Sequence, residues 1–247
     1  FKVKIKEKAR YVNIGRCTGC GDCIAKCPVK VPSEFEEGLA NRKAIYLPFP
    51  QAVPRKVTID ADHCRMITQG KCGVCKKVCQ AGAIDYEQKD NTVEVLAKAV
   101  VVATGFDLMD ARRLPQFGLG TCKDVVTSLQ LERVLSASGP TGGHLVRPSD
   151  GTEPKRLAFV QCVGSRDTKV YRYCSSVCCM YATKESILLR EHVPDVDTTI
   201  FYMDMRATGK GFQEFVHRAE KSYGVRYVRA RPAYVQPAHG DKGVLVT

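Results

Sequence analysis

Four cysteines in one short stretch constrain this chain more than any other feature of its sequence. The stretch CTGCGDCIAKCP, residues 17–28, separates them by two, two and three residues and ends in a proline. Three thiolates from one tight loop can bind three corners of an iron-sulfur cubane, and Gly19 and Gly21 let the backbone fold closely round its sulfides. The fourth thiolate, Cys27, leaves the loop on a short helix and reaches a different cluster. Pro28 stops the chain from continuing along the first cluster.

A second set of cysteines follows and completes the spacing of the bacterial two-cluster ferredoxins. Reciprocal ligation predicts two 4Fe-4S clusters, one held by Cys17, Cys20, Cys23 and Cys79 and the other by Cys64, Cys72, Cys75 and Cys27. Two features depart from the usual spacing: seven residues separate Cys64 from Cys72, and Gln80 stands where a second proline is usual. We expect the loop MITQGK, residues 66–71, to bring Cys64 back to its cluster.

Other interpretations of these cysteines stay open. They are buried structural thiols or zinc sites, although zinc sites usually close with four ligands from paired short knuckles. His63 stands beside Cys64 and competes as a ligand, but a lone histidine there is expected to be a loop residue.

Thirteen cysteines in 247 residues need an explanation other than disulfide bridges, because a chain of this length can bury a core without them. No secretory signal opens the chain, and its longest apolar runs, such as residues 99–103 and 157–160, are too short to span a bilayer. We therefore expect a cytoplasmic protein without a transmembrane segment, in which clustered thiols stay reduced and bind metal. Because the chain begins with Phe1 inside a strand-like run, we expect it to be part of a longer protein.

The net charge of +12, from 38 basic and 26 acidic residues, taken alone suggests an acidic partner such as nucleic acid. Each 4Fe-4S cluster on four thiolates carries a charge of about −2, so three clusters would offset roughly half of this excess. The basic residues are scattered and follow no nucleic-acid-binding motif, so we predict no nucleic-acid partner.

The cysteine-rich segment is predicted to be an insertion. Alternating runs before it, residues 2–12, and after it, residues 92–95, indicate strands that pair once the insert folds out between them. The apolar run KAVVVATGF, residues 98–106, then predicts a buried strand. In two-domain flavoproteins such a strand end lies against FAD, which makes Ala103, Thr104 and Gly105 candidate FAD contacts.

The remaining sequence has βαβαβ order. Strands are predicted at 156–161, 198–204 and 225–232, and helices at 176–192 and 211–224. This order is half of a doubly wound sheet, whose first turn would carry G-x-G-x-x-G if it bound a pyrophosphate. That turn holds only Gly164 and is filled by Cys162, Cys174, Cys178 and Cys179. It predicts a third metal cluster instead of a nicotinamide nucleotide, with a redox-active or zinc-binding thiol cluster as the alternative.

Four segments together resemble the A subunits of heterodisulfide reductases and their relatives in other anaerobes. They are CTGCGDCIAKCPVKVPSEFEEGL, KAIYLPFPQAVP, the ATGF strand, and QCVGSRD followed by YCSSVCCMYATKES. The resemblance implies a thioredoxin-reductase-like flavoprotein with an inserted two-cluster ferredoxin domain and a further 4Fe-4S cluster close to FAD. By similarity, Cys162, Cys174, Cys178 and Cys179 ligate that cluster, although the gap after Cys162 is a residue shorter than in some relatives. Lys184 matches a lysine placed near the flavin N5 and is the expected catalytic residue, and Gly164 is expected among the cofactor contacts.

The predicted fold class is α/β: a partial FAD/NAD-type doubly wound domain with an inserted α+β ferredoxin domain. The expected parts are a flavoprotein strand at 1–10, the insert at 11–88, a partial FAD-binding half with its linker at 89–153, and a second Rossmann-like half at 154–247. Residues 138–154 are expected to connect the sheet regions, and Cys122 to be a packed thiol. Further FAD-binding elements are expected before Phe1 and after Thr247.

The predicted function is electron transfer between FAD and 4Fe-4S clusters in a complex of heterodisulfide reductase type, which in the family allows flavin-based electron bifurcation. The expected partners are cluster-bearing and disulfide-reducing subunits, a hydrogenase or other electron-donor module, and ferredoxin. The alternatives are a non-bifurcating flavoprotein of a sulfur-metabolism complex and a zinc-binding cysteine-rich protein.

Overall fold

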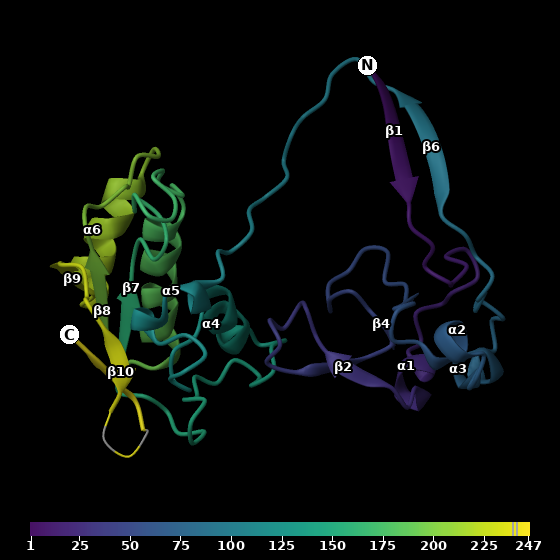
Figure 1. The fold of residues 1–247 in the computed structure, drawn as a ribbon, viewed down its shortest axis with the longest axis horizontal. Coiled ribbons are helices and arrows are strands. Elements are labelled where there is room, and N and C mark those ends of the chain that lie inside the picture. The colour runs from purple at the N-terminus through teal and green to yellow at the C-terminus, as the bar shows by residue number, and fades with distance from the viewer. Residues whose placement is uncertain (239, 241) are drawn as a thin grey trace. The chain divides into compact units, whose positions relative to one another are not determined.

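A computed structural model describes residues 1–238, 240 and 242–247 as two compact units, residues 1–106 and 107–247. In unit 1, β1 (Lys2–Glu7) pairs antiparallel with β6 (Asn91–Leu96), as Figure 1 shows. Lys2 lies opposite Leu96 and Glu7 opposite Asn91, and most side chains of this ribbon are exposed. The predicted pairing of the strands on either side of the cysteine-rich segment is confirmed.

The segment between these strands forms short elements around a small core. They are α1 (Asp22–Lys26), β2 (Lys30–Pro32), β3 (Asn41–Lys43), β4 (Ile45–Tyr46), β5 (Thr58–Ile59), α2 (Arg65–Gln69) and α3 (Val74–Val78). The strands pair as two antiparallel hairpins, β2 with β3 and β4 with β5. Val12, Ile45 and Val57 are almost fully buried in the same cluster as several of the cysteines. Metal-binding side chains and the apolar core of this segment therefore share one interior.

The structure corrects the expected loop at 66–71. Residues 65–69 form helix α2, which begins after Cys64 and ends at Gly70 in a left-handed conformation with φ 65°. The Thr68 side chain donates a hydrogen bond of 3.0 Å to the Cys64 carbonyl and closes this turn. The extra residues between Cys64 and Cys72 are thus used for a helical turn, for which Gly70 supplies the C-terminal cap.

The structure also corrects the predicted strand at 98–106. Residues 97–110 form neither helix nor strand, and the side chains of Val101 and Val102 are 90% and 78% exposed. A strand needs a neighbouring strand to satisfy its N–H and C=O groups, and none of the strands in the described residues lies beside this segment. The apolar run alone was therefore not enough to make a strand.

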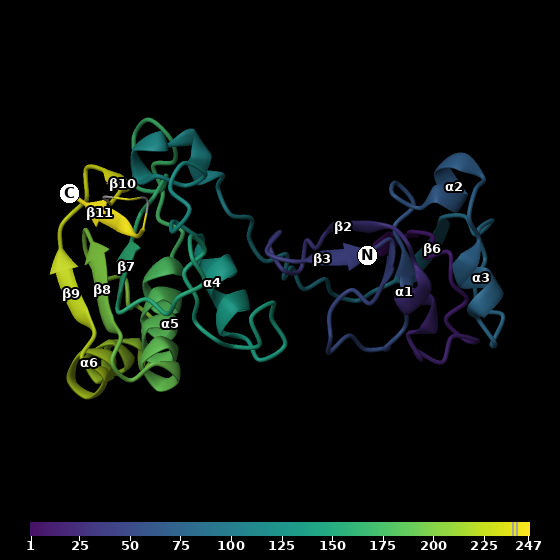
Figure 2. The same ribbon diagram turned by 90° about the horizontal axis from the view of Figure 1, so that it is seen from below.

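Unit 2 contains a parallel three-stranded sheet in the order β7-β8-β9, in which β7 spans Arg156–Val160, β8 Asp197–Tyr202 and β9 Arg226–Arg229. Figure 2 shows these strands side by side, with α5 (Cys178–His192) and α6 (Phe212–Tyr223) as the connections. Leu189 of α5 and Ile200 of β8 are fully buried, and Gly224 closes α6 with φ 67°. The βαβαβ prediction is confirmed, although α5 begins two residues later than expected.

One helix of unit 2 escaped the sequence analysis. Helix α4 (Ser128–Leu135) begins with a capping box, in which the Gln130 N–H donates to Thr127 Oγ1 at 3.2 Å and the Thr127 N–H donates to Gln130 Oε1 at 3.0 Å. Its Leu131 and Leu135 pack against Leu189 of α5. The helix thereby covers one face of α5.

The rest of unit 2 consists of short elements and turns. They are the 3-10 turns η1 (Ala111–Arg113) and η2 (Pro115–Phe117) and the antiparallel strands β10 (Val235–Pro237) and β11 (Val244–Val246). Residues 138–154 form turns without helix or strand, as predicted for a connection. Cys122 is buried, as expected of a packed thiol. Among the helices that the structure describes, none combines the length and apolar character needed to cross a bilayer.

Candidate iron-sulfur sites

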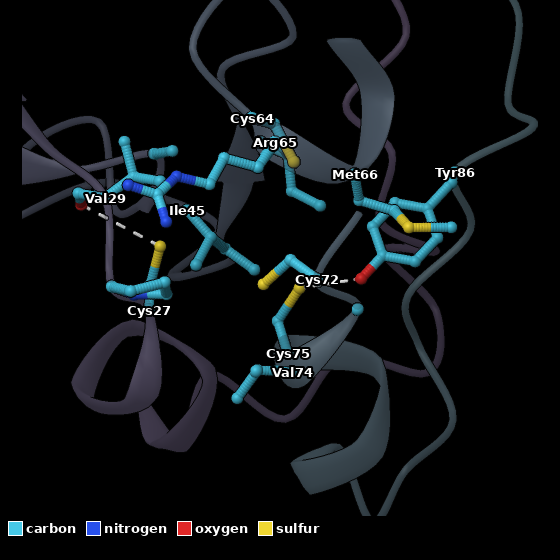
Figure 3. Close-up of a pocket in the computed structure, with 14 residues that line it drawn as sticks. Cys27, Val29, Ile45, Cys64, Arg65, Met66, Cys72, Val74, Cys75 and Tyr86 are labelled. Atoms are coloured by element: carbon cyan, nitrogen blue, oxygen red, sulfur yellow. Dashed lines mark hydrogen bonds between the residues drawn. The ribbon is translucent and has the colours of Figure 1, made fainter. Parts of the chain in front are cut away.

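Four cysteines from both sequence motifs line one pocket of unit 1 (Figure 3). Cys27 follows the last residue of α1, Cys64 precedes α2, Cys72 lies in the turn before α3, and Cys75 lies within α3. The remaining lining is mainly apolar and includes Ile45. The structure thus brings Cys27 of the first motif to the three cysteines of the second, which is the grouping that crossed ligation requires.

Short contacts surround this pocket. The Tyr86 hydroxyl lies 2.9 Å from Cys75 Sγ, and the Lys43 ammonium donates to the Cys27 carbonyl at 2.6 Å. Burial raises the pKa of Cys75, and burial together with the neighbouring Cys75 thiol raises the pKa of Tyr86. Without a bound cation these thiols therefore resist ionisation, whereas a metal centre would hold them as thiolates.

The second group consists of Cys17, Cys20, Cys23 and Cys79. Cys17 and Cys23 are buried, Cys20 is exposed, and Cys79 follows α3 and accepts a hydrogen bond of 3.3 Å from the Ala83 N–H. Burial raises the pKa of Cys23 to about 11, and the neighbouring Cys20 and Cys17 thiols act in the same direction.

The loop of this second group is held tightly against the chain that follows β4. Gly19 has φ 76°, and a Cβ atom there would collide with the Arg55 carbonyl oxygen. The Lys56 ammonium donates a hydrogen bond to the Cys17 carbonyl. Glycine is therefore required both for the left-handed backbone and for the close approach of residue 55.

The third group lies at the end of β7 and the start of α5. Cys162 has φ 59°, Cys174 Sγ accepts a hydrogen bond of 3.3 Å from the Ser176 N–H, and Cys178 and Cys179 occupy the first turn of α5. A hydrogen bond from the Cys179 thiol lowers the pKa of Cys178 to about 6, and the same bond raises the pKa of Cys179. One thiolate of the pair is thus stabilised at neutral pH.

An arginine stands beside this group. Burial raises the pKa of Cys162, while the charge and hydrogen bond of Arg166 oppose that rise. The Arg166 guanidinium also pairs with Asp204, which in turn accepts from Arg206 at 2.9 Å. A fixed cation therefore faces the sulfur of Cys162.

The three groups suit cubane clusters better than single ions. All thirteen cysteines are free thiols, and in the described part of the chain no three His, Cys, Asp or Glu side chains are grouped as one metal ion would need. In a cubane each thiolate binds a different iron atom, so the ligands need not converge on one point. His63 lies in a turn with its ring 2.9 Å from Asp60, as expected for a loop residue.

The predicted flavin contacts divide between the two units. Ala103, Thr104 and Gly105 lie in the exposed segment 97–110 of unit 1, whereas Gly164 and Lys184 belong to unit 2. Their combination into one flavin site stays a prediction. Gly164 has φ 74°, and a Cβ atom there would collide with the Met109 side chain.

Lys184 lies beside two carboxyl groups, neither of which the sequence analysis singled out. Its ammonium is 3.2 Å from Glu132 of α4, and both side chains are about half exposed. Glu185, the next residue, is 1% exposed and its Oε2 has no hydrogen-bond partner among the described residues. A capping box before α4 was the one sequence signal that could have located Glu132 on a helix.

The cysteine groups and the parallel α/β sheet together define the class of protein, which is an iron-sulfur protein. No protein-family model matches the chain. Over its whole length it is 47% identical to the iron-sulfur A subunit of the CoB–CoM heterodisulfide reductase of Methanocaldococcus jannaschii and 51% identical to the second such A subunit of Methanopyrus kandleri, and it covers 37% of each. It is 47% identical, over 95% of its length, to the A subunit of the H2:CoB–CoM heterodisulfide,ferredoxin reductase of Methanothermobacter marburgensis and covers 35% of that protein.

The chain therefore belongs to the family of heterodisulfide reductase A subunits, and the predicted resemblance is confirmed for this segment. The chain spans little more than a third of the length of these curated relatives.

Proposed function

We propose that this chain is a segment of an electron-transfer subunit in a flavin and iron-sulfur oxidoreductase of heterodisulfide reductase type. The pocket that joins Cys27 to Cys64, Cys72 and Cys75 carries the proposal, because crossed ligation is specific to two-cluster ferredoxins. Residues 11–88 would form the inserted ferredoxin domain, residues 1–10 and 89–153 parts of the FAD-binding half, and residues 154–247 the half with a third cluster.

FAD, when bound, supplies two-electron or one-electron chemistry, and 4Fe-4S clusters supply one-electron steps. The residues of this chain would hold these groups and set their surroundings. Apolar walls exclude water from the pocket at Cys75, and the first turn of α5 directs its dipole toward Cys178 and Cys179. Each such interaction with a thiolate is worth about 0.3–1 kcal/mol.

Lys184 is the proposed catalytic residue at the flavin, with Ala103, Thr104, Gly105 and Gly164 as further contacts. Its ion pair with Glu132 supports this role, because a paired lysine keeps its charge and a defined position. The positive charge would favour negative charge that develops on the flavin ring.

Electron bifurcation and the partners are proposals at the level of the whole complex. Splitting of electron pairs at FAD into single electrons along the clusters would fit the relative whose name includes both heterodisulfide and ferredoxin. Cluster-bearing and disulfide-reducing subunits, an electron-donor module and ferredoxin are the proposed partners, in the cytoplasm. A non-bifurcating flavoprotein is the alternative.

The proposal is tested by iron and acid-labile sulfide analysis of anaerobically purified protein. We expect about twelve irons per chain, as three 4Fe-4S clusters require. Cys27→Ser should lose or perturb the cluster of Cys64, Cys72 and Cys75 and spare the other two. Cys122→Ser, which changes a cysteine outside the three groups, is the matched control and should leave iron unchanged.

The third site is tested by the double variant Cys178→Ser, Cys179→Ser. A loss of about four irons with the ferredoxin signals intact supports it. Absence of labile sulfide from the parent protein would refute the whole proposal. Loss of the Cys17, Cys20, Cys23 cluster in Cys27→Ser would refute crossed ligation, and tight NADPH binding by the parent would refute the third site.

A further inference from the structure

We propose that Tyr86 is a positioning residue that donates a hydrogen bond to the Cys75 sulfur and raises the reduction potential of the cluster at Cys27, Cys64, Cys72 and Cys75. The two clusters of residues 11–88 would then be unequal by construction. This inference rests on the proposed function, since it requires a cluster on these four cysteines.

The geometry around Tyr86 carries the inference. Its hydroxyl oxygen lies 2.9 Å from Cys75 Sγ, and its side chain lines the same pocket as the four cysteines (Figure 3). It also lines the adjoining open cleft, together with Met66, Lys76 and Lys77. Tyr86 therefore stands between the enclosed pocket and the solvent-facing cleft.

The backbone around Tyr86 is held in place on both sides. The Asp85 N–H donates to the Tyr11 carbonyl at 3.0 Å, and Ile84, which is buried, forms an isolated bridge with Val12. The Lys76 ammonium lies 5.8 Å from the centre of the Tyr86 ring. A hydroxyl fixed by these contacts has a defined direction toward Cys75.

The direction of the hydrogen bond follows from the chemistry of the ligand. A cysteine sulfur bound to iron carries no proton, so the tyrosine hydroxyl is the donor and the sulfur the acceptor. One-electron reduction adds negative charge to the cluster and its thiolates, and hydrogen bonds to more negative acceptors are stronger. The bond therefore stabilises the reduced state more than the oxidised state, while the proton stays on Tyr86.

The second group of cysteines offers a contrast within the same unit. Its sulfur atoms accept the backbone hydrogen bond from the Ala83 N–H to Cys79 at 3.3 Å. In the part of the chain that the structure covers, no side-chain hydroxyl contacts the sulfur of Cys17, Cys20, Cys23 or Cys79. Removal of the Tyr86 hydroxyl is therefore expected to affect one cluster only.

The test compares Tyr86→Phe with the parent chain, both purified without oxygen and loaded with clusters. EPR-monitored redox titration should show one cluster becoming harder to reduce, with about a tenfold change in its reduction equilibrium, which is about 59 mV for one electron. The other cluster should keep its potential, and iron content should be unchanged. Resonance Raman bands of the iron–thiolate bonds should also lose part of the H2O-to-D2O shift that the parent shows.

Tyr46→Phe is the matched control, because it removes a hydroxyl in the same unit whose ring stacks on Arg42 at 3.9 Å. It should leave both potentials unchanged. If Tyr86→Phe loses iron, 3-fluorotyrosine at position 86 keeps the shape and donates more strongly, and should raise the same potential.

The outcomes separate this inference from the proposed function. A parent chain without cluster signals would refute the proposed function itself. Intact clusters with unchanged potentials in Tyr86→Phe, equal shifts of both clusters, or no upward shift with 3-fluorotyrosine would each overturn the role of Tyr86.

Discussion

Glu185 provides a direct test of how α4 and α5 pack, because its carboxyl group is buried without a hydrogen-bond partner for Oε2 among the described residues. Burial raises the pKa of Glu185 from 4.5 to about 8, the Glu132 carboxylate adds to the rise, and Lys184 opposes it. The folded protein therefore keeps this carboxyl protonated at neutral pH.

The sign of the pH dependence follows from proton linkage. Between pH 4.5 and about 8 the unfolded chain releases the proton of Glu185 and the folded protein retains it, so the free energy of unfolding falls as pH rises. At about 1.36 kcal/mol for each pH unit, the upper bound across this window is about 5 kcal/mol. We expect a measured effect of a few kcal/mol, because local rearrangement would admit water to the carboxylate.

The perturbation is Glu185→Gln, which keeps the shape and removes the ionisation. At pH 5 the variant should equal the parent, and at pH 8.5 it should be more stable by a few kcal/mol. Urea unfolding under anaerobic conditions, followed by helical circular dichroism at several pH values, measures the difference. Glu214→Gln, an exposed change in α6, is the control and should show no such trend. A parent-minus-variant difference that is flat with pH would refute the reasoning.

Three further predictions concern named contacts. Gly19→Ala should reduce iron bound at its cluster severalfold, because the new Cβ meets the Arg55 carbonyl, whereas Gly38→Ala has the same φ of 76° with open space and should bind iron normally; equal iron in both would contradict this. Leu189→Ala, at a fully buried position, should lower the free energy of unfolding by about 2–5 kcal/mol in urea titrations, and a loss below about 1 kcal/mol would contradict the packing. Arg166→Gln should lower the potential of the third cluster in EPR titrations without loss of iron, because a cation beside Cys162 favours the reduced state, and an unchanged potential would count against that role.

Local patterns predicted the sheet of unit 2 well. Apolar periodicity located β7, β8 and β9, and Gly224 marked the end of α6 because its left-handed backbone suits glycine. The strands β1 and β6 were predicted from alternation, and their pairing followed because both flank one insert. In these cases the sequence signal and the tertiary structure agree.

Other features depend on neighbours that the sequence does not identify. The run at 98–106 has a strand's composition, but it has no strand partner among the described residues and stays irregular and exposed. Glu185 looks like a solvated helix residue in sequence, and it becomes buried because α4 packs on that side of α5. The Tyr86–Cys75 contact joins residues eleven apart and depends on the fold of the whole segment.

The excess of basic residues has a structural role at the cysteine groups. Lys43 donates to the carbonyl of Cys27, and Lys56 donates to the carbonyl of Cys17, so each of the two proposed clusters has an ammonium group at the backbone of one ligand. Clusters of about −2 charge need such compensation in a partly apolar interior, where an unpaired charge is costly. Arg166 supplies the same compensation at Cys162 from a side chain fixed by Asp204. Cations held at separate cysteine groups, rather than gathered on one face, are what a chain that binds several anionic clusters requires.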